Sequence, residues 1–220
     1  MPAEFQIHTI VSMPFAENTY VVWQAGRRDA LVIDPGLEPE LILNFLRDQE
    51  LVPAAILNTH GHGDHIGGNA ALKQAFPAAP LVVGVHEARL LTDPWENLSA
   101  LFGQAVTSPP ADVLVREGDA VEYAGIRLEV LDVPGHSPGH VVFVYPGSPP
   151  HVFGGDVLFR GSIGRTDFPN SDGRLLFEGI RRKLFTLPPE TVVYPGHGPV
   201  TTVGHERKTN PFVGDHASAG

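Results

Sequence analysis

The sequence predicts an α/β fold with two β-sheets, each covered by helices on one face. Apolar runs of strand length, such as 54–57 and 80–85, recur along the whole chain. Segments in which apolar residues recur at helical spacing lie between them, and 24 glycines with 21 prolines supply many tight turns. Strands and helices that alternate in this order pack as layers around a core.

The first half of the chain is expected to form one sheet with its helices. Apolar patterns predict strands here at 5–11, 19–24, 30–33, 54–58 and 81–85. Turns are expected at 14–18 and 26–29. Helical spacing predicts helices over 38–50 and 65–76.

The second half is expected to form the other sheet. Strand patterns fall at 113–115, 120–123, 126–133, 141–145, 151–155 and 191–194. Ser171 is the expected cap of a helix over 172–186, and the Pro-, Ser- and Gly-rich region 92–112 is expected to be a loop. We expect one domain over 1–212 and a flexible tail over 213–220, because the last residues lack a packing pattern.

Composition narrows the class of protein. The formal net charge is -10, and the longest basic run is 181–183, so we expect no nucleic-acid partner. The chain has no cysteine, which excludes disulfides and thiolate metal sites. It has no secretory pattern and no apolar stretch near the ~20 residues of a membrane span. We therefore expect a cytoplasmic protein without a membrane partner.

The segment 59–68, THGHGDHIGG, carries the strongest functional pattern. His60 and His62 are two residues apart, so their imidazoles point the same way on an extended chain. Asp64 and His65 follow at the start of an expected helix, and the glycines leave room for backbone close to a metal. A glycine-rich turn with surface histidines is the alternative, which four candidate ligands within six residues disfavour.

Three more candidate ligands, His136, Asp156 and His197, show one shared pattern. Each follows an expected strand and lies beside glycine, in PGHSPGH, FGGDVLF and YPGHGP. Ligands collect where strands end, because the loops there are held by a rigid scaffold. A random scatter of histidines would not repeat this placement.

Together these segments resemble the motif set of the metallo-β-lactamase superfamily. The resemblance implies a four-layer αβ/βα sandwich of two mixed sheets, with the site at one edge between them. It implies that His60, His62 and His136 hold a first metal ion, that Asp64, His65 and His197 hold a second, and that Asp156 bridges both. Asp64 and Asp156 would then be the catalytic carboxylates.

The donor types suit two transition-metal ions. Imidazole and carboxylate suit Zn, Fe and Mn, and we expect Zn first. A metal-bound water can have a pKa of ~7, which would supply hydroxide as the nucleophile against a polarised carbonyl. The expected reaction is therefore hydrolysis.

Within the superfamily, the chain most resembles the short, single-domain branch of glyoxalase II, hydroxyacylglutathione hydrolase. The segments IDPG, GHSPGHVVF, GDVLFRGSIGRTDFP and GHGPVTTVGHERKTNPF carry the likeness. This resemblance implies a small thioester substrate such as S-D-lactoylglutathione. Longer glyoxalase II enzymes add a helical domain that binds glutathione, and we expect those glutathione contacts to be absent here.

Other branches and functions fit less well. The commonest β-lactamases use a cysteine ligand, and RNA-processing and flavin–diiron members carry extra domains. The runner-up is a mononuclear Fe(II) persulfide dioxygenase, which would share the ligand positions and GRTDF at 164–168. His140 stands where those enzymes usually have cysteine, and GHGP at 196–199 also differs. A metal-dependent binding protein is a third hypothesis.

A few residues are candidates for supporting roles. Arg165 and Lys208 could bind the carboxylates of a glutathione-like substrate. The alternatives are a structural ion pair for Arg165 and a solvated surface position for Lys208. Asp34 could orient a ligand histidine or cap a turn, and His140 is expected behind the ligands. Three aromatic residues could line a substrate pocket, namely Trp95, Phe102 and Phe168.

Overall fold

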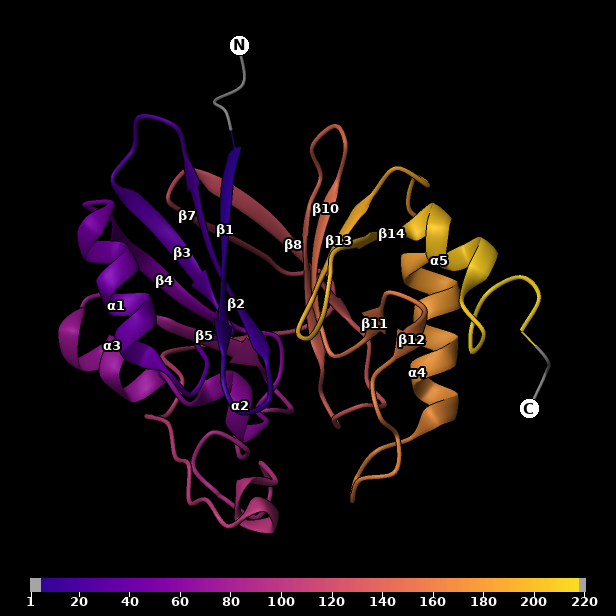
Figure 1. Cartoon of the computed structure of the whole chain (residues 1–220), viewed down its shortest axis with the longest axis horizontal. Helices are drawn as coiled ribbons and strands as arrows, with labels where there is room; N and C mark the ends of the chain where they lie inside the picture. The colour runs from indigo at the N-terminus through magenta and orange to yellow at the C-terminus, as the bar shows by residue number, and fades with distance from the viewer. Residues whose placement is uncertain (1–4, 218–220) are drawn as a thin grey trace.

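The structure is a computed structural model that describes residues 5–217. Two six-stranded sheets face each other, with helices on their outer sides (Figure 1). The first sheet has the order β1-β2-β3-β4-β5-β6 and contains β1 (Phe5–Ser12), β2 (Glu17–Gln24), β3 (Asp29–Ile33), β4 (Val52–Asn58), β5 (Leu81–Gly84) and β6 (Val113–Val115). Strands β1 to β3 pair antiparallel and β3 to β6 pair parallel, so the sheet is mixed, as expected.

The second sheet has the order β14-β13-β10-β9-β8-β7. It contains β7 (Ala120–Tyr123), β8 (Ile126–Asp132), β9 (Val141–Tyr145), β10 (His151–Gly155), β13 (Val192–Pro195) and β14 (Thr201–Thr202). Only β10 and β13 pair parallel. A small hairpin of β11 (Leu158–Phe159) and β12 (Ser162–Ile163) follows β10.

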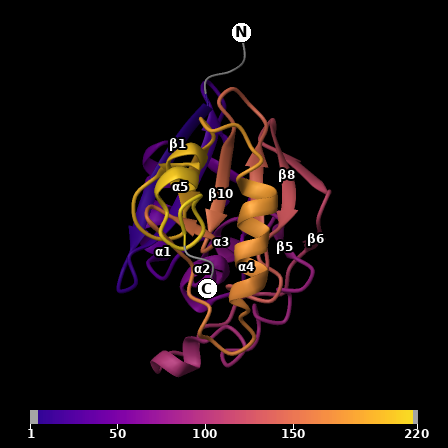
Figure 2. The same ribbon diagram turned by 90° about the vertical axis from the view of Figure 1, so that its right-hand side faces the viewer.

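The core has three apolar layers, which fits the predicted four-layer sandwich. The central layer lies between the sheets and includes Tyr20, Leu31 and Phe143. The outer layer of the first sheet lies under α1 (Pro39–Asp48) and α3 (Asn69–Ala75). That of the second sheet lies under α4 (Gly173–Gly179) and the π-helical segment η2 (Ile180–Leu184), as the side view in Figure 2 shows.

The helix expected over 65–76 is two helices, α2 (Gly63–Ile66) and α3. The helix is interrupted at Gly67 and Gly68, where the Gly68 N–H donates to the Pro35 carbonyl at 2.8 Å and the segment before α1 packs closely against both glycines. A Cβ atom on Gly67 would lie 2.6 Å from Leu37 Cδ2, and one on Gly68 would lie 2.9 Å from Pro35 Cβ. The expectation of a single helix was wrong, since helical spacing does not register such contacts between distant segments.

The helix expected over 172–186 spans α4 and η2, and its cap differs from the prediction. Asp172 caps it, because its carboxylate accepts hydrogen bonds from the backbone N–H groups of Arg174 and Leu175 at 2.9 and 3.2 Å. The Ser171 hydroxyl instead donates to the Phe168 carbonyl at 2.7 Å. Within the region 92–112, expected to be a loop, Ser99–Phe102 forms a short 3-10 helix, η1.

The packed chain extends beyond the expected boundary at residue 212. Helix α5 (Val203–Thr209), which we did not predict, is followed by Val213, which is buried in the outer layer of the second sheet. The Asp215 carboxylate also lies 3.4 Å from Arg207 Nε. Residues 218–220 of the expected tail lie outside the described residues. Within residues 5–217, no helix combines the length and apolar character needed to cross a membrane.

Candidate metal centre

The seven residues expected to bind metal converge at one edge of the two sheets. All of them lie in the segments that follow strands β4, β8, β10 and β13. The first sheet supplies His60, His62, Asp64 and His65, and the second supplies His136, Asp156 and His197. The site is therefore built jointly by both sheets.

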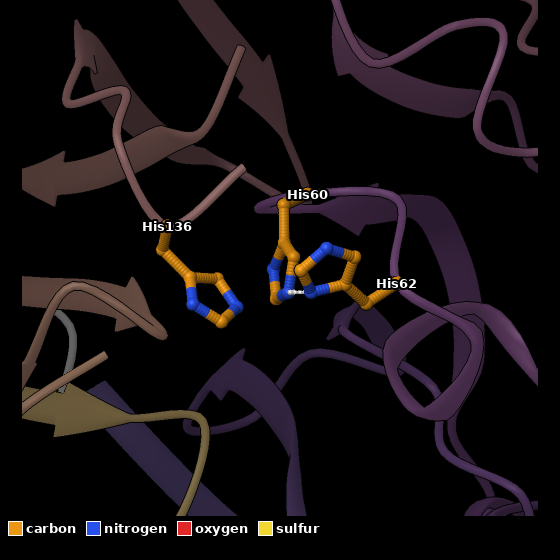
Figure 3. A group of neighbouring side chains, drawn as sticks. All are labelled: His60, His62 and His136. Carbon is orange, nitrogen blue, oxygen red and sulfur yellow. Dashed lines mark hydrogen bonds between the residues drawn. The ribbon is translucent and has the colours of Figure 1, made fainter. Parts of the chain in front are cut away.

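The first group of candidate ligands consists of three buried imidazoles, His60, His62 and His136. One ring nitrogen from each lies within 4.8 Å of the others, and Figure 3 shows the three rings turned toward a common space. His60 Nε2 and His62 Nδ1 are 3.1 Å apart. Burial lowers the pKa of all three, and to about 3 for His62, with the neighbouring histidines adding to the effect. The rings are neutral near pH 7, which is the form that binds metal.

Hydrogen bonds on the far side of two of these rings fix their orientation. His136 Nδ1 lies 2.9 Å from the Arg165 carbonyl oxygen, so it carries the proton and leaves Nε2 as the acceptor. His60 Nδ1 lies 3.1 Å from the Thr59 hydroxyl. The lone pairs of both Nε2 atoms therefore face the common space.

The second group, Asp64, His65 and His197, combines a carboxylate with two imidazoles. Asp64 Oδ2 lies 3.3 Å from His197 Nε2 and 3.8 Å from His65 Nε2. His197 Nδ1 donates to the Phe15 carbonyl at 3.1 Å. The His65 side chain is fully buried, whereas that of His197 is 26% exposed. Burial opposes protonation of His65, but Asp64 and Asp156 outweigh it and raise its pKa.

Asp156 lies between the two groups and contacts both. Its Oδ2 is 3.4 Å from His136 Nε2 and 3.5 Å from His197 Nε2. Its Oδ1 is 3.4 Å from His65 Nε2. Burial favours the neutral acid, but the nearby His65 and His197 outweigh it and hold the pKa of Asp156 well below its usual range. A carboxylate in this position can bridge two cations.

Buried atoms without partners show that these residues fit metal ions. Among the described side chains, His65 Nε2, His136 Nε2 and Asp156 Oδ1 are buried and have no hydrogen-bond partner. Buried polar atoms are normally paired, since leaving one unpaired costs roughly 1–3 kcal/mol. All three atoms face the centre, and a cation there would satisfy them. Gly196 permits this packing, because a Cβ atom on it would lie 2.2 Å from Asp156 Oδ1.

The two supporting residues expected from the sequence contact the candidate ligands. Asp34 Oδ2 lies 3.2 Å from His65 Nδ1, and the same carboxylate accepts hydrogen bonds from the Thr59 N–H and hydroxyl at 2.7 and 2.6 Å. His140 stacks on His60 with ring centroids 4.6 Å apart, and its Nε2 accepts from the Asp156 N–H at 3.1 Å. Both residues are buried behind the centre.

Two further residues, which the sequence analysis missed, hold the ligand segments in place. The buried carboxylate of Glu87 accepts hydrogen bonds from the N–H groups of Gly61 and Gly139 at 2.7 and 2.6 Å. It thereby joins the segment that carries His60 and His62 to the one that carries His136. Its position just after strand β5 is the only signal for it in the sequence.

Asn18 plays the corresponding role for His197. Its side-chain amide donates to the carbonyls of Pro195 and Gly198, at 3.0 and 2.8 Å, on either side of that histidine. Its backbone N–H donates to the Gly196 carbonyl at 2.7 Å. The sequence places Asn18 in an expected turn and gives no sign of these contacts.

A cavity of about 260 Å³ opens over the centre. Its walls include Phe15, Phe102, Phe159, Phe168 and Arg165. Phe102 and Phe168 are therefore placed as expected. Trp95, which is 69% exposed, and Lys208, which lies exposed on α5, are not among the described residues that line it.

Comparisons with known proteins agree with this geometry. The profile of the metallo-β-lactamase superfamily matches residues 13–197, a range that contains all seven candidate ligands. Hydroxyacylglutathione hydrolase GloC of Haemophilus influenzae is 35% identical over 94% of this chain and 97% of its own.

Two solved structures share both fold and sequence with this chain. The BLEG-1 B3 metallo-β-lactamase is 38% identical with a TM-score of 0.90, covering 94% of this chain and 99% of that one. The protein TTHA1623, solved in a di-iron-bound form, is 42% identical with a TM-score of 0.82, covering 93% and 99%. The chain therefore belongs to the metallo-β-lactamase superfamily, a family of metallo-hydrolases.

Proposed function

We propose that the protein is a two-metal hydrolase of small thioesters such as S-D-lactoylglutathione. The observation that carries the proposal is the position of Asp156, whose two carboxylate oxygens reach imidazoles of both ligand groups at 3.4 to 3.5 Å. The relationship to hydroxyacylglutathione hydrolase GloC supports the thioester, and the di-iron-bound relative supports two ions.

Each candidate ligand has a proposed place. The first ion would be held by His60, His62 and His136, the second by Asp64, His65 and His197, and both by Asp156. Zinc is our first choice, and iron and manganese suit the same donors. When bound, the ions would lower the pKa of a coordinated water and polarise the substrate carbonyl.

The residues of the chain orient the ligands and supply the pocket. Asp34, Thr59 and the Arg165 carbonyl fix the imidazole rings from behind. Apart from the candidate ligands, Arg165 is the only ionisable group among the described residues that line the cavity. A thiolate with a pKa near ~8.5 departs without a general acid, whereas an amide nitrogen needs a proton. A cavity lining without a further acidic group therefore suits a thioester substrate better than an amide.

Metal-exchange experiments separate this function from its competitors. Apoprotein would be loaded separately with Zn and with Fe(II). Loss of S-D-lactoylglutathione and of a chromogenic cephalosporin would be followed by absorbance, and oxygen uptake with glutathione persulfide by an electrode. We expect thioester hydrolysis in both metal forms, because hydrolysis needs no redox chemistry. The Zn form cannot support dioxygenation. We also expect negligible oxygen uptake by the Fe form, because His140 and GHGP at 196–199 differ from the dioxygenase pattern.

Two results would overturn the assignment. Oxygen uptake by the Fe form alone, without thioester loss in either form, would establish the persulfide dioxygenase. Faster loss of the cephalosporin than of the thioester would establish a β-lactamase, the activity named for the BLEG-1 relative.

His136→Ala should abolish the thioesterase, and the matched control His205→Ala, at an exposed position away from the cavity, should retain it.

A further inference from the structure

Aromatic side chains form much of the cavity wall next to the metal centre. Phe168 lies against the first group, with ring centroids 5.9 Å from His62 and 6.2 Å from His136. Phe159 lies against the second group, 6.2 Å from His197. The wall thus brings apolar surface close to both candidate metal positions.

A second aromatic pair lies at the mouth of the cavity. Phe15 and Phe102 meet edge to face with ring centroids 5.4 Å apart, and they are 36% and 51% exposed. Phe102 belongs to η1, in the segment between β5 and β6 that projects beyond the sheets at the bottom of Figure 1. Contiguous exposed apolar surface beside a site is a feature of ligand-binding grooves, whereas single exposed apolar side chains are common.

Two of the three uncharged polar side chains that line the cavity, those of Asn97 and Ser99, are already engaged within their own loop, and Gln104 is the third. Asn97 donates to the Val106 carbonyl at 2.9 Å and accepts from the Ser99 N–H at 3.0 Å. The Ser99 hydroxyl accepts from the Val106 N–H at 3.1 Å. Asn97 and Ser99 hold the loop in shape, so Gln104 is the one uncharged polar side chain left to a ligand among the described lining residues, beside four phenylalanines and Leu98.

The one cationic side chain of the wall is also engaged. Arg165 Nε and Nη2 each donate to an Asp167 carboxylate oxygen at 2.9 Å, and the guanidinium lies 4.2 Å from the centre of the Phe168 ring. Among the described residues lining the cavity, this leaves no unpaired arginine or lysine for the carboxylates of glutathione. A net charge of -10 further disfavours recognition through anionic groups.

We propose that the cavity selects its substrate by the acyl group, and that it prefers thioesters of 2-hydroxy acids with an aromatic side chain over lactoyl thioesters. The proposal rests on the proposed function and narrows its substrate class. A polar thiol carrier buried against phenylalanines would leave its own polar groups unpaired, so the carrier extends toward solvent. The acyl side chain then occupies the wall formed by Phe102, Phe159 and Phe168.

The closing experiment compares two substrates that differ only in that side chain. S-mandeloylglutathione and S-lactoylglutathione share the thioester, the 2-hydroxyl and the thiol, but carry phenyl and methyl respectively. With Zn-loaded full-length protein, we expect kcat/KM to be at least about tenfold higher for the mandeloyl substrate, the low end of what extra apolar groups contribute in such pockets. Phe102→Ala and Phe168→Ala should each reduce this ratio severalfold. The control Phe212→Ala, at an exposed phenylalanine outside the lining, should not.

A binding measurement separates failure of this inference from failure of the proposed function. S-phenacylglutathione and S-acetonylglutathione are thioethers that cannot be hydrolysed, and they again differ as phenyl and methyl. We expect calorimetry to give tighter binding of the phenacyl compound by about tenfold. Tighter phenacyl binding without turnover of either thioester would support the apolar site and reject the thioesterase. Equal binding of the two thioethers, or a kcat/KM ratio of one or below, would overturn the inference.

Discussion

The two candidate metal positions differ in how far the protein encloses them. The first is surrounded by three buried imidazoles, none of which is appreciably exposed. The second includes His197 and Asp64, whose side chains are 26% and 20% exposed. Both are more open than His62 and His136, which also line the cavity. Enclosure fixes ligand geometry in advance and therefore favours tight binding, whereas an open position leaves room for a substrate.

The supports of the two positions differ in the same way. The first position has Glu87, one buried carboxylate that joins the segments from both sheets. In the second position, Asp34 holds His65 from behind, but His197 depends on the turn after β1 and the start of β2, through the Phe15 carbonyl and the Asn18 amide. The molecule thus combines one position that is rigid by burial with another whose exposed ligand, His197, is held by the segment between β1 and β2.

The largest effect should follow removal of the group that both positions share. We expect Asp156→Ala to lower kcat/KM by about a thousandfold or more, because it removes a contact to each ion and several kcal/mol of charge stabilisation. His197→Ala touches only the second position and should cost less. Elemental analysis should find one ion or none in the first variant and one ion in the second. Equal residual rates at matched metal content would contradict the bridging role.

Smaller effects on metal affinity are expected from two variants, each of which changes the support of one metal position. We expect Glu87→Gln to weaken the affinity for the more tightly bound of the two metal ions, the one in the first position, by roughly 10- to 100-fold. The reason is that an amide NH₂ would then face one of the two N–H donors. Asn18→Ala should instead weaken the affinity for the more weakly bound ion, in the second position, since two carbonyls beside His197 lose their donor. Zn titration against a competing chelator measures both affinities.

The matched controls are exposed residues of the same types. Glu178→Gln, in a side-chain pair with Arg174, and Asn44→Ala, on the outer face of α1, should leave both affinities unchanged. If Glu87→Gln and Asn18→Ala weaken the binding of the same metal ion, the two positions do not have separate supports.

The same contrast explains what the sequence could predict. The candidate ligands were placed correctly at strand ends because a strand is a local pattern, and the chain beyond it must emerge at the sheet edge. Glu87 and Asn18 could not be recognised, because their partners lie in distant segments and because a single Glu or Asn forms no sequence motif. The break at Gly67 and Gly68 was missed for the same reason, since the Gly68 N–H donates to the carbonyl of Pro35, in a distant segment. Local periodicity therefore placed the candidate ligands at the ends of strands, while their supports are set by tertiary packing.

The smallest effect should come from Arg165, which touches the first position only through its backbone. Its carbonyl accepts from His136 Nδ1, whereas its guanidinium is paired with Asp167 at the surface, and exposed pairs contribute little. A change of side chain leaves the carbonyl in place. We therefore expect Arg165→Glu to leave kcat within about twofold and to raise KM for a glutathione thioester by only a few-fold.

Salt and carrier charge test the origin of that small effect. The rise in KM should come from repulsion between a new surface carboxylate and the anionic carrier, which 0.5 M salt would largely screen. It should also vanish for the uncharged N-acetylcysteamine thioester of the same acid. Steady-state kinetics of both substrates at low and high salt would measure this. A tenfold fall in kcat with unchanged KM would instead mean that the side chain controls the orientation of His136, and the enclosed position would then depend on a surface residue after all.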